Sequence, residues 1–276
     1  MGFPSGEVTG RAVVLAAGRG TRMRAAEPAT GLSAAQRAAA ADGHKAMMPV
    51  GRPFLDYILS GLADAGLQRV CLVVGPAHQA MRDYYTGPGR PQRLALEFAQ
   101  QDQPRGTADA VLAAEGFAGG EPVLVLNGDN LYPSGGLAAL RGLPAAGLLG
   151  FRRSTLLALG NIPTERIRAF ALIEQDAAGI LTRIVEKPGA AEAIEFGADP
   201  LVSMNAWLLP PAIYAACRAI RPSPRGELEL QDAVRLAMER GERFEVILSE
   251  EGVLDLSRPG DIPEVAARLA DREVRP

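Results

Sequence analysis

Short apolar runs alternate with segments of helical spacing through the first half of this sequence. Residues 11–17 predict a buried strand that ends in glycines, and residues 53–66 place apolar side chains at helical spacing before a glycine. Further strands are expected at 69–75, 94–99 and 122–126, with helices at 77–85 and 107–117. The alternation predicts crossover units in an α/β, Rossmann-like sheet, mostly parallel, with helices on both faces. Ligands of such sheets bind beyond the carboxyl ends of the strands.

After about residue 145 the rhythm changes. Strands are expected at 147–151, 168–174, 181–186 and 201–209, with few helices between them. Helices at 211–220 and 228–240, a strand at 244–248 and a last helix near 261–271 follow. We interpret this half as mixed sheet with a smaller lobe that faces the substrate. The 276 residues then form a single domain of two halves, about 11–145 and about 146–276.

Composition and charge exclude several classes of function. Apolar residues make up 47% and charged residues 22%, so a buried core is expected. The formal net charge is −3, which argues against non-specific nucleic-acid binding because that needs a basic face. Cys71 and Cys217 lie in apolar runs and indicate neither a disulfide nor a zinc site. The sequence shows no membrane span and no apolar signal core at its start, so we expect a cytoplasmic protein without a membrane partner.

A loop with two glycines, LAAGRGTRM at residues 15–23, follows the first predicted strand. Glycines there let backbone N–H groups approach a phosphate closely, and Arg22 adds a cation with forked donors. The alternatives are a plain turn or a dinucleotide-binding loop. The dinucleotide fingerprint requires a third glycine where this sequence has Met23, so a phosphate-binding loop is favoured.

Two more charged residues lie near predicted strand ends. Lys45 opens the segment KAMMPV, and Asp129 follows the strand at 122–126 in the segment NGDN. A solvated surface lysine and a turn or capping aspartate are the ordinary alternatives. Because carboxyl ends of parallel strands share one edge of a sheet, Asp129 is expected to project into the same cleft as the glycine loop.

Together these motifs resemble those of the nucleoside-diphosphate-sugar pyrophosphorylases, also called sugar-1-phosphate nucleotidyltransferases, from Val13 to about Leu269. The resemblance implies a nucleotide-diphospho-sugar transferase-like fold, with a nucleotide-binding half at about 11–145 and a sugar-phosphate-binding half at about 146–276. It also implies a reaction in which a nucleoside triphosphate and a sugar 1-phosphate give a nucleotide sugar and pyrophosphate.

The resemblance assigns the nucleotide to the first half. In the family the lysine that matches Lys45 contacts triphosphate oxygens, and the segment that matches 101–111 contacts the base. A glutamine amide offers both a donor and an acceptor, which suits a pyrimidine or guanine edge, while Thr107 could equally cap a helix. The implied nucleotide-binding residues are Leu15, Ala16, Ala17, Gly18, Gly20, Thr21, Gln101, Gly106 and Thr107.

The resemblance places a metal between the halves and the sugar phosphate in the second half. Asp129 and Asp255 match two aspartates that bind Mg²⁺ in the family, and Mg²⁺ needs only one or two carboxylates beside phosphate oxygens and waters. The segment IVEKP at 184–188 matches a signature whose glutamate accepts from sugar hydroxyls and whose lysine holds the sugar's phosphate. The implied sugar-phosphate-binding residues are Glu186, Lys187, Asn205 and Arg225, and the implied catalytic residues are Arg22, Lys45 and Lys187.

One segment departs from the family pattern. The gap between the matching arginine and lysine is usually short, whereas residues 25–44 fill it here. Residues 25–42 are mostly small and polar, so they can bury little apolar surface. We expect this segment to be mobile without nucleotide and partly helical when the triphosphate is bound.

Two other functions stay open. The same chemistry could act on a different phosphorylated alcohol, as in cytidylyltransferase-type enzymes, or the chain could hold a nucleotide sugar without turning it over. The sequence favours pyrimidine nucleotides slightly, but the base, the sugar and the oligomeric state are not determined by it.

Overall fold

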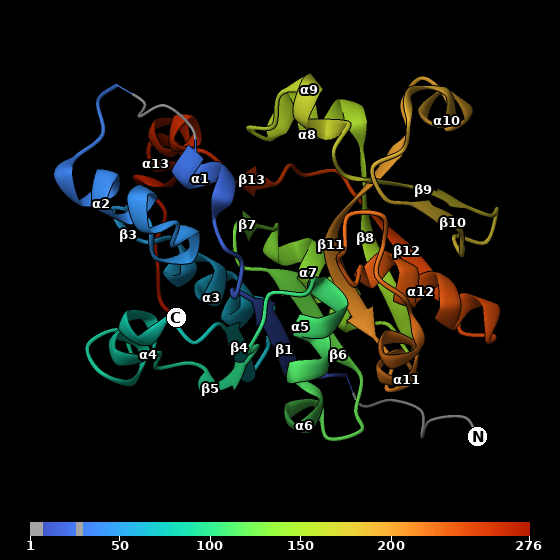
Figure 1. The fold of residues 1–276 in the computed structure, drawn as a ribbon, viewed down its shortest axis with the longest axis horizontal. Coiled ribbons are helices and arrows are strands. Elements are labelled where there is room, and N and C mark those ends of the chain that lie inside the picture. Colours follow the sequence, from blue (N-terminus) through green and yellow to red (C-terminus); the bar gives the residue numbers. More distant parts are fainter. Residues whose placement is uncertain (1–7, 26–29) are drawn as a thin grey trace.

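The computed structural model describes residues 8–25 and 30–276 (Figure 1). Its centre is a nine-stranded sheet in which seven strands follow in the order β10-β9-β11-β6-β1-β4-β5, while β8 pairs with β11 and β12. The strands are β1 (Arg11–Leu15), β4 (Arg69–Val74), β5 (Ala95–Gln100), β6 (Val123–Asn127), β8 (Ala146–Arg152), β9 (Ala171–Gln175), β10 (Leu181–Val185), β11 (Leu201–Leu209) and β12 (Phe244–Ser249).

The first half forms the parallel part of the sheet. β1 pairs in parallel with β4 and β6, and β4 pairs in parallel with β5. Helices α3 (Phe54–Asp64), α4 (Gln79–Thr86) and α5 (Thr107–Ala113) lie in the connections between these strands. The carboxyl ends of β1, β5 and β6 therefore meet at one edge of the sheet, which is where the predicted ligand-binding loops begin.

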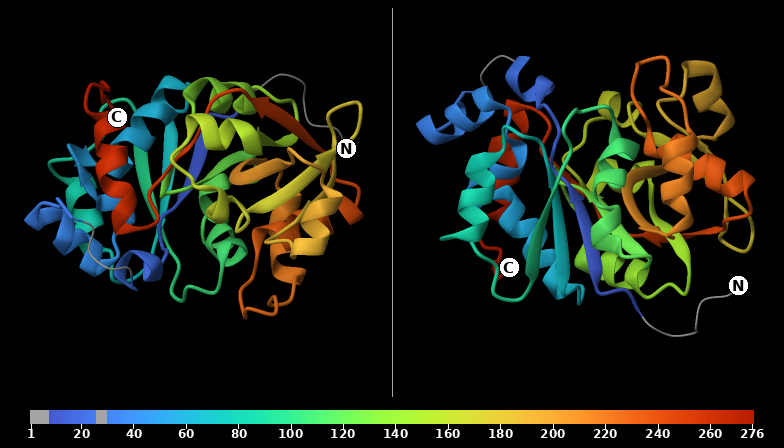
Figure 2. Two further views of the ribbon diagram at one scale, coloured as in Figure 1. Left: turned by 90° about the horizontal axis from the view of Figure 1, so that it is seen from above. Right: turned by 60° about the horizontal axis from the view of Figure 1, so that its bottom comes forward.

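Alternate side chains of the central strands face two separate cores. Ala12 and Val14 pack in one core with α3, α7 (Ser134–Arg141) and α13 (Ile262–Leu269). Val13 packs in the other core with α5, α11 (Ala212–Ala219) and α12 (Leu230–Glu239). Figure 2 shows the two helical layers on opposite sides of the sheet. The predicted fold class, a mostly parallel α/β sheet with helices on both faces, is confirmed.

Strand β11 joins the two halves and changes neighbour along its length. Its first residues, 201–203, pair with β9, whereas residues 207–209 pair with β6. On its other side the register with β8 shifts between Ser203 and Trp207, which marks a bulge. Asn205 lies between the two stretches and has a φ of 61°, in the left-handed region. The sheet thus divides beside Asn205.

The segment that interrupts the family pattern is partly helical. It contains α2 (Ala34–Asp42), and α1 (Thr21–Ala25) ends at its first residue, while residues 26–29 lie outside the described part of the chain. Ser33 and Gln36 form a capping box at the start of α2. Leu32 and Ala40 are buried, and Gln36 Nε2 donates to Pro49 O at 2.9 Å. These contacts anchor the helix to the core, and its mobility stays a prediction.

Several short elements were not expected from the sequence. The expected strands of the second half are present, but the helices α8 (Arg153–Leu159), α9 (Thr164–Ile167) and α10 (Ala190–Glu195) lie between them. Helices of one or two turns carry too few residues for a clear apolar period. The remaining short elements are η1 (Lys45–Met47), β2 (Pro49–Val50), β3 (Arg52–Pro53), α6 (Glu115–Ala118), β7 (Asn130–Leu131), β13 (Leu254–Asp255) and η2 (Pro259–Asp261).

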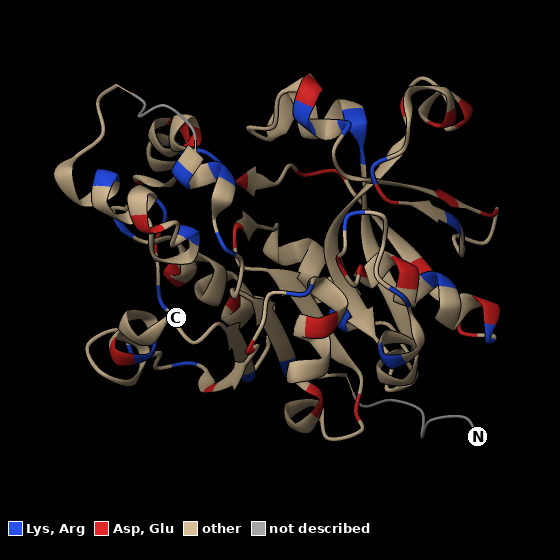
Figure 3. Ribbon diagram, viewed as in Figure 1, with Lys and Arg blue, Asp and Glu red and all other residues tan. Residues whose placement is uncertain are grey.

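Most charged residues are at least partly exposed, and both cysteines are buried. Acidic and basic residues are interspersed over the outer helices and loops (Figure 3). Burial raises the pKa of both Cys71 and Cys217 to about 12, so neither thiol ionises at neutral pH. No helix within residues 8–25 and 30–276 is long and apolar enough to cross a membrane.

Gly20 is the residue at which the loop after β1 touches the inserted segment. It has a φ of 60°, and a Cβ there would overlap the backbone of Gly43. We expect Gly20→Ala to lower the free energy of unfolding by about 2–5 kcal/mol, combining left-handed strain and overpacking. Denaturant unfolding measures this. Gly18→Ala is the matched control, because a Cβ at Gly18 meets nothing within 4 Å. Equal stability of the two variants would contradict the close approach.

Candidate active site

A pocket of about 590 Å³ opens at the carboxyl ends of the parallel strands. The loop after β1 contributes residues 15–21, the segment before β2 contributes residues 43–46, and the loop before α5 contributes Gln101, Pro104 and Gly106. The loop after β6 adds Asp129, and Arg225 with its neighbours closes the side toward the second half. All nine predicted nucleotide-binding residues therefore line one pocket.

The glycine loop presents Arg19 to the pocket rather than Arg22. Residues 16–20 form a loop between β1 and α1, and α1 begins at Thr21. Arg22 is exposed on α1 and does not line the pocket, whereas Arg19, between the two glycines, does. The sequence pattern favoured Arg22, the arginine that follows both glycines. Which of the two arginines faces the pocket depends on where α1 starts. Arg22 as a phosphate contact stays a prediction.

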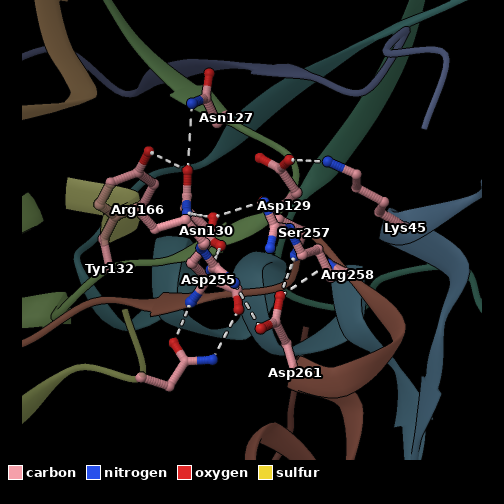
Figure 4. Close-up of polar contacts among 11 residues, drawn as sticks. Lys45, Asn127, Asp129, Asn130, Tyr132, Arg166, Asp255, Ser257, Arg258 and Asp261 are labelled. Atoms are coloured by element: carbon pink, nitrogen blue, oxygen red, sulfur yellow. Dashed lines mark hydrogen bonds and ion pairs between the residues drawn. The ribbon is translucent and has the colours of Figure 1, made fainter. Parts of the chain in front are cut away.

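Lys45 and Asp129 meet in the pocket although they lie 84 residues apart in sequence. Lys45 Nζ donates to Asp129 Oδ2 at 2.8 Å, with the side chains 18% and 28% exposed (Figure 4). η1 holds Lys45, and the turn after β6 holds Asp129. The predicted phosphate lysine and the predicted metal carboxylate thus neutralise each other beside the glycine loop.

The structure gives Asp255 a protein partner. Its carboxylate is 2% exposed and pairs with Arg166, while Oδ1 also accepts from Asn130 Nδ2 at 2.9 Å and from Ser257 Oγ at 3.1 Å (Figure 4). Arg166 binds Asp261 as well, at 2.6 Å. Asp255 does not line the pocket that Asp129 lines. Asp255 as a second metal ligand stays a prediction, and it requires Arg166 to release one carboxylate oxygen.

The residues present fit a magnesium site completed by substrate. Among the described residues, no group of three or more His, Cys, Asp or Glu side chains could hold a metal ion. Asp129 supplies a hard oxygen ligand at the pocket, partly exposed. Mg²⁺ is commonly held by one or two carboxylates together with substrate phosphates and waters. One carboxylate that lines the pocket is therefore enough as a protein ligand.

The segment predicted to contact the base is shaped by close packing. Gly106 has a φ of 127°, and a Cβ there would overlap the backbone of Leu228, so glycine is required. Thr107 lines the pocket, and its Oγ1 accepts from Leu230 N at 2.9 Å. The hydroxyl therefore connects the start of α5 with the start of α12. Gln101 is 6% exposed, and its amide faces this turn.

Three of the predicted sugar-phosphate residues, Glu186, Lys187 and Arg225, form one charged group. Arg225 lies 3.6 Å from Glu186 and 2.5 Å from Glu229, and Lys187 Nζ lies 3.7 Å from Glu186 Oε1. Burial raises the pKa of the Glu186 carboxyl, and the charges of Lys187 and Arg225 oppose this shift.

Asn205 Oδ1 accepts from Gln231 Nε2 at 2.8 Å and from Trp207 Nε1 at 3.2 Å. Arg225 lines the pocket, whereas Glu186, Lys187 and Asn205 do not.

Backbone strain coincides with two of these residues. Among the described residues, Lys187 (φ 48°) and Asn205 (φ 61°) are the non-glycine residues in the left-handed region. Such conformations cost about 1–3 kcal/mol each and concentrate at functional sites. Lysine is not a residue that favours this region, so the surrounding structure must hold Lys187 in this conformation.

Two histidines also line the pocket, and sequence reasoning missed both. His44 and His78 have ring centroids 5.0 Å apart, and His78 Nδ1 accepts from Gly75 N at 3.0 Å. Burial lowers the pKa of His78, and the neighbouring His44 lowers it further. The chain has no other histidine, but a count of two gave no signal that they meet.

The fold and the pocket define an α/β protein with a Rossmann-like sheet. A glycine-containing loop, residues 15–21, lines a pocket at the carboxyl ends of the strands. The chain belongs to the nucleotidyl transferase family, whose model matches residues 11–272. This membership confirms the resemblance to the sugar-1-phosphate nucleotidyltransferases that the motifs indicated. It also confirms that the chain belongs to a family of nucleotidyltransferases.

Individual relatives agree with the family. The UTP–glucose-1-phosphate uridylyltransferase of Haloferax volcanii is 28% identical over 262 residues, which cover 95% of this chain and 97% of that protein. The glucose-1-phosphate thymidylyltransferase of an Actinoplanes species is 30% identical over 235 residues, covering 84% and 68%. A crystal structure of UDP-glucose pyrophosphorylase complexed with UDP-glucose has the same fold, with a TM-score of 0.74 at 19% identity, covering 97% and 100%.

The Arg166 cluster predicts a large effect on stability. Removing one partner of a buried ion pair leaves uncompensated charge, so Arg166→Met should lower the free energy of unfolding by about 3–5 kcal/mol. Two carboxylates, Asp255 and Asp261, lose their cation. Exposed Arg168 provides the control, with Arg168→Met expected within about 0.5 kcal/mol of the parent. Equal denaturation midpoints for both variants would show that the cluster is not a fixed part of the fold.

Proposed function

We propose that this chain condenses a nucleoside triphosphate with a sugar 1-phosphate, releasing pyrophosphate. The observation that carries the proposal is one pocket in which the glycine loop, the Lys45–Asp129 pair and Arg225 adjoin. The glycine loop and Lys45 suit a triphosphate, and Arg225 leads to the group that suits a phosphorylated sugar. The named activities of the relatives support the same reaction.

The chemistry asks for positioning rather than for a protein nucleophile. An oxygen of the sugar phosphate is already anionic and attacks the α-phosphorus, while the bond from that phosphorus to the bridging oxygen breaks and pyrophosphate leaves with the electron pair. No strong general base is needed, so the protein's tasks are alignment and charge compensation. Lys45 and Arg19 lie where they can compensate the departing pyrophosphate, with Arg22 a further candidate.

Mg²⁺, when bound, would neutralise phosphate charge, and Asp129 would hold it. The ion pair with Lys45 has a consequence for this assignment. Lys45 would bind triphosphate oxygens and Asp129 would hold the metal, so each member of the ion pair would exchange its partner for a new one when substrate binds. The ion pair then keeps both side chains at the pocket before substrate arrives.

Glu186, Lys187, Asn205 and Arg225 would hold the sugar phosphate. Lys187 and Arg225 supply cations for its phosphate, and Glu186 supplies an acceptor for its hydroxyls. Asn205 uses its Oδ1 within the protein, which leaves its amide N–H groups as donors. Glucose 1-phosphate with UTP or dTTP is the first pair to test, because the relatives described above are named for uridylyl and thymidylyl transfer to that sugar phosphate.

The test is a matrix of nucleoside triphosphates against sugar 1-phosphates and other phosphorylated alcohols such as phosphocholine, read by pyrophosphate release with and without Mg²⁺. Release only with sugar phosphates supports the proposal. Release only with another phosphorylated alcohol favours the cytidylyltransferase-type alternative. Binding of a nucleotide sugar without any release favours the non-catalytic alternative.

We expect Asp129→Asn to lower kcat/KM by about 100-fold or more, because the variant loses an anionic ligand where phosphate charge accumulates. The loss should be partly restored at high Mg²⁺ concentration, since a weaker ligand raises the metal requirement. Steady-state kinetics across Mg²⁺ concentrations measure both effects. The exposed Asp64→Asn is the control. A well-folded Asp129→Asn enzyme with parental turnover would rule out the metal assignment.

We expect Lys187→Ala to raise the KM for sugar 1-phosphate by about 10–100-fold and to spare nucleotide binding, because a charge-assisted bond is lost at one end of the cleft. A second measurement uses composition, since only two of the chain's 29 basic residues are lysines, Lys45 and Lys187. In the parent, amine acylation followed by mass spectrometry should show triphosphate protecting Lys45 and sugar phosphate protecting Lys187. The reverse pattern would exchange the two assignments.

A further inference from the structure

Two acceptors hold the amide of Gln101 in one orientation. Gln101 Nε2 donates to Gly106 O at 3.0 Å and to Asp109 Oδ2 at 2.8 Å. A carbonyl and a carboxylate can only accept, so the amide nitrogen must face them and the oxygen must point elsewhere. Gln101 lines the pocket, and within the described residues no group donates to its Oε1. Gln101 therefore offers the pocket an acceptor.

Asp109 is itself fixed. It lies in the first turn of α5 and is 8% exposed. Arg105 binds its other oxygen, because Nε and Nη2 of Arg105 donate to Asp109 Oδ1 at 3.1 and 2.5 Å. The guanidinium occupies Oδ1 and leaves Oδ2 for Gln101. Arg105, Asp109 and Gln101 thus form a chain of hydrogen bonds that leads from the surface to the pocket.

We propose that Asp109 is a positioning residue for base selection, which keeps Gln101 Oε1 turned to the pocket so that bases with a ring N–H are preferred. This inference rests on the proposed function, since the base is that of the nucleoside triphosphate. Uracil and thymine carry a donor at N3, and guanine carries one at N1. Cytosine and adenine have a lone pair at the corresponding ring nitrogen. A lone pair facing Oε1 leaves both atoms without a partner, which is costly in a buried site.

Asp109→Asn tests the orientation with almost no change of shape. Arg105 has only donors to offer, so it should select the amide oxygen of the substituted side chain and turn the new NH₂ toward Gln101. Gln101 Nε2 then keeps only Gly106 O as an acceptor, so the amide is no longer held in one orientation and can also turn its NH₂ to the pocket. The ratio of kcat/KM for UTP over CTP should fall by about tenfold or more, the equivalent of at least one hydrogen bond.

A second variant distinguishes positioning from general destabilisation. In Arg105→Met/Asp109→Asn the guanidinium is gone, so the new amide is free to turn its oxygen to Gln101. We expect the UTP preference to return toward that of the parent. General destabilisation would instead increase with the second substitution. Arg105→Met alone should keep the preference, because the Asp109 carboxylate still accepts from Gln101. Asp102→Asn is the matched control, since Asp102 is exposed and contacts Gln100.

The ratio is measured both as kcat/KM and as Kd for the Mg²⁺ complexes of UTP and CTP by calorimetry. The binding ratio tests base selection even if no sugar phosphate is turned over, so failure of the proposed function is seen separately. A parental preference for UTP that falls in Asp109→Asn and returns in the double variant supports the inference. A parental preference for CTP or ATP overturns it. Equal losses for UTP and CTP in Asp109→Asn, without recovery in the double variant, also overturn it.

Discussion

Strand β11 is the element on which both halves of the molecule depend. It pairs with β9 through residues 201–203 and with β6 through residues 207–209, so one strand connects the smaller lobe to the parallel sheet. The change of neighbour requires an irregular backbone between these stretches, and Asn205 supplies it with a φ of 61°. Asparagine tolerates the left-handed region better than most residues. The residue that divides the sheet is therefore also one that we propose binds the sugar phosphate through its amide N–H groups.

Two of the cations that line the pocket are paired with carboxylates, so they do not form a patch of positive charge alone. Lys45 faces Asp129, and Arg225 faces Glu186 and Glu229. Each pair keeps long side chains near one geometry, and in the proposed function each cation would exchange its carboxylate partner for a phosphate. The chain otherwise uses arginine almost throughout, with lysine kept at positions 45 and 187. A lysine is a compact point charge on a flexible stem, which suits a cation that must follow a moving phosphate.

The sequence predicted those parts of the structure that arise from local patterns. Apolar runs and helical periods gave the parallel strands and the helices on both faces, because burial on two faces leaves a strong signal. The resemblance of the motifs to the family predicted Lys45, Gln101 and Asp129 as site residues, and these three line one pocket. It did not predict Arg166 as the partner of Asp255, since 89 residues separate them and a buried arginine looks like an exposed one in sequence. The choice between Arg19 and Arg22 depended on the first residue of a five-residue helix.

The Arg166 cluster explains why residues far from the pocket affect its geometry. Burying two carboxylates with one guanidinium costs desolvation that the ion pairs offset only with good geometry, so such a cluster specifies an arrangement more than it stabilises one. Here it fixes the segment around β13 against β7, where Asp255 pairs with Asn130. The next residue, Leu256, donates its N–H to Asp129 O at 2.9 Å. The backbone that carries the pocket carboxylate is thus held by the C-terminal segment, so the position of Asp129 depends on Arg166 even though Arg166 does not line the pocket.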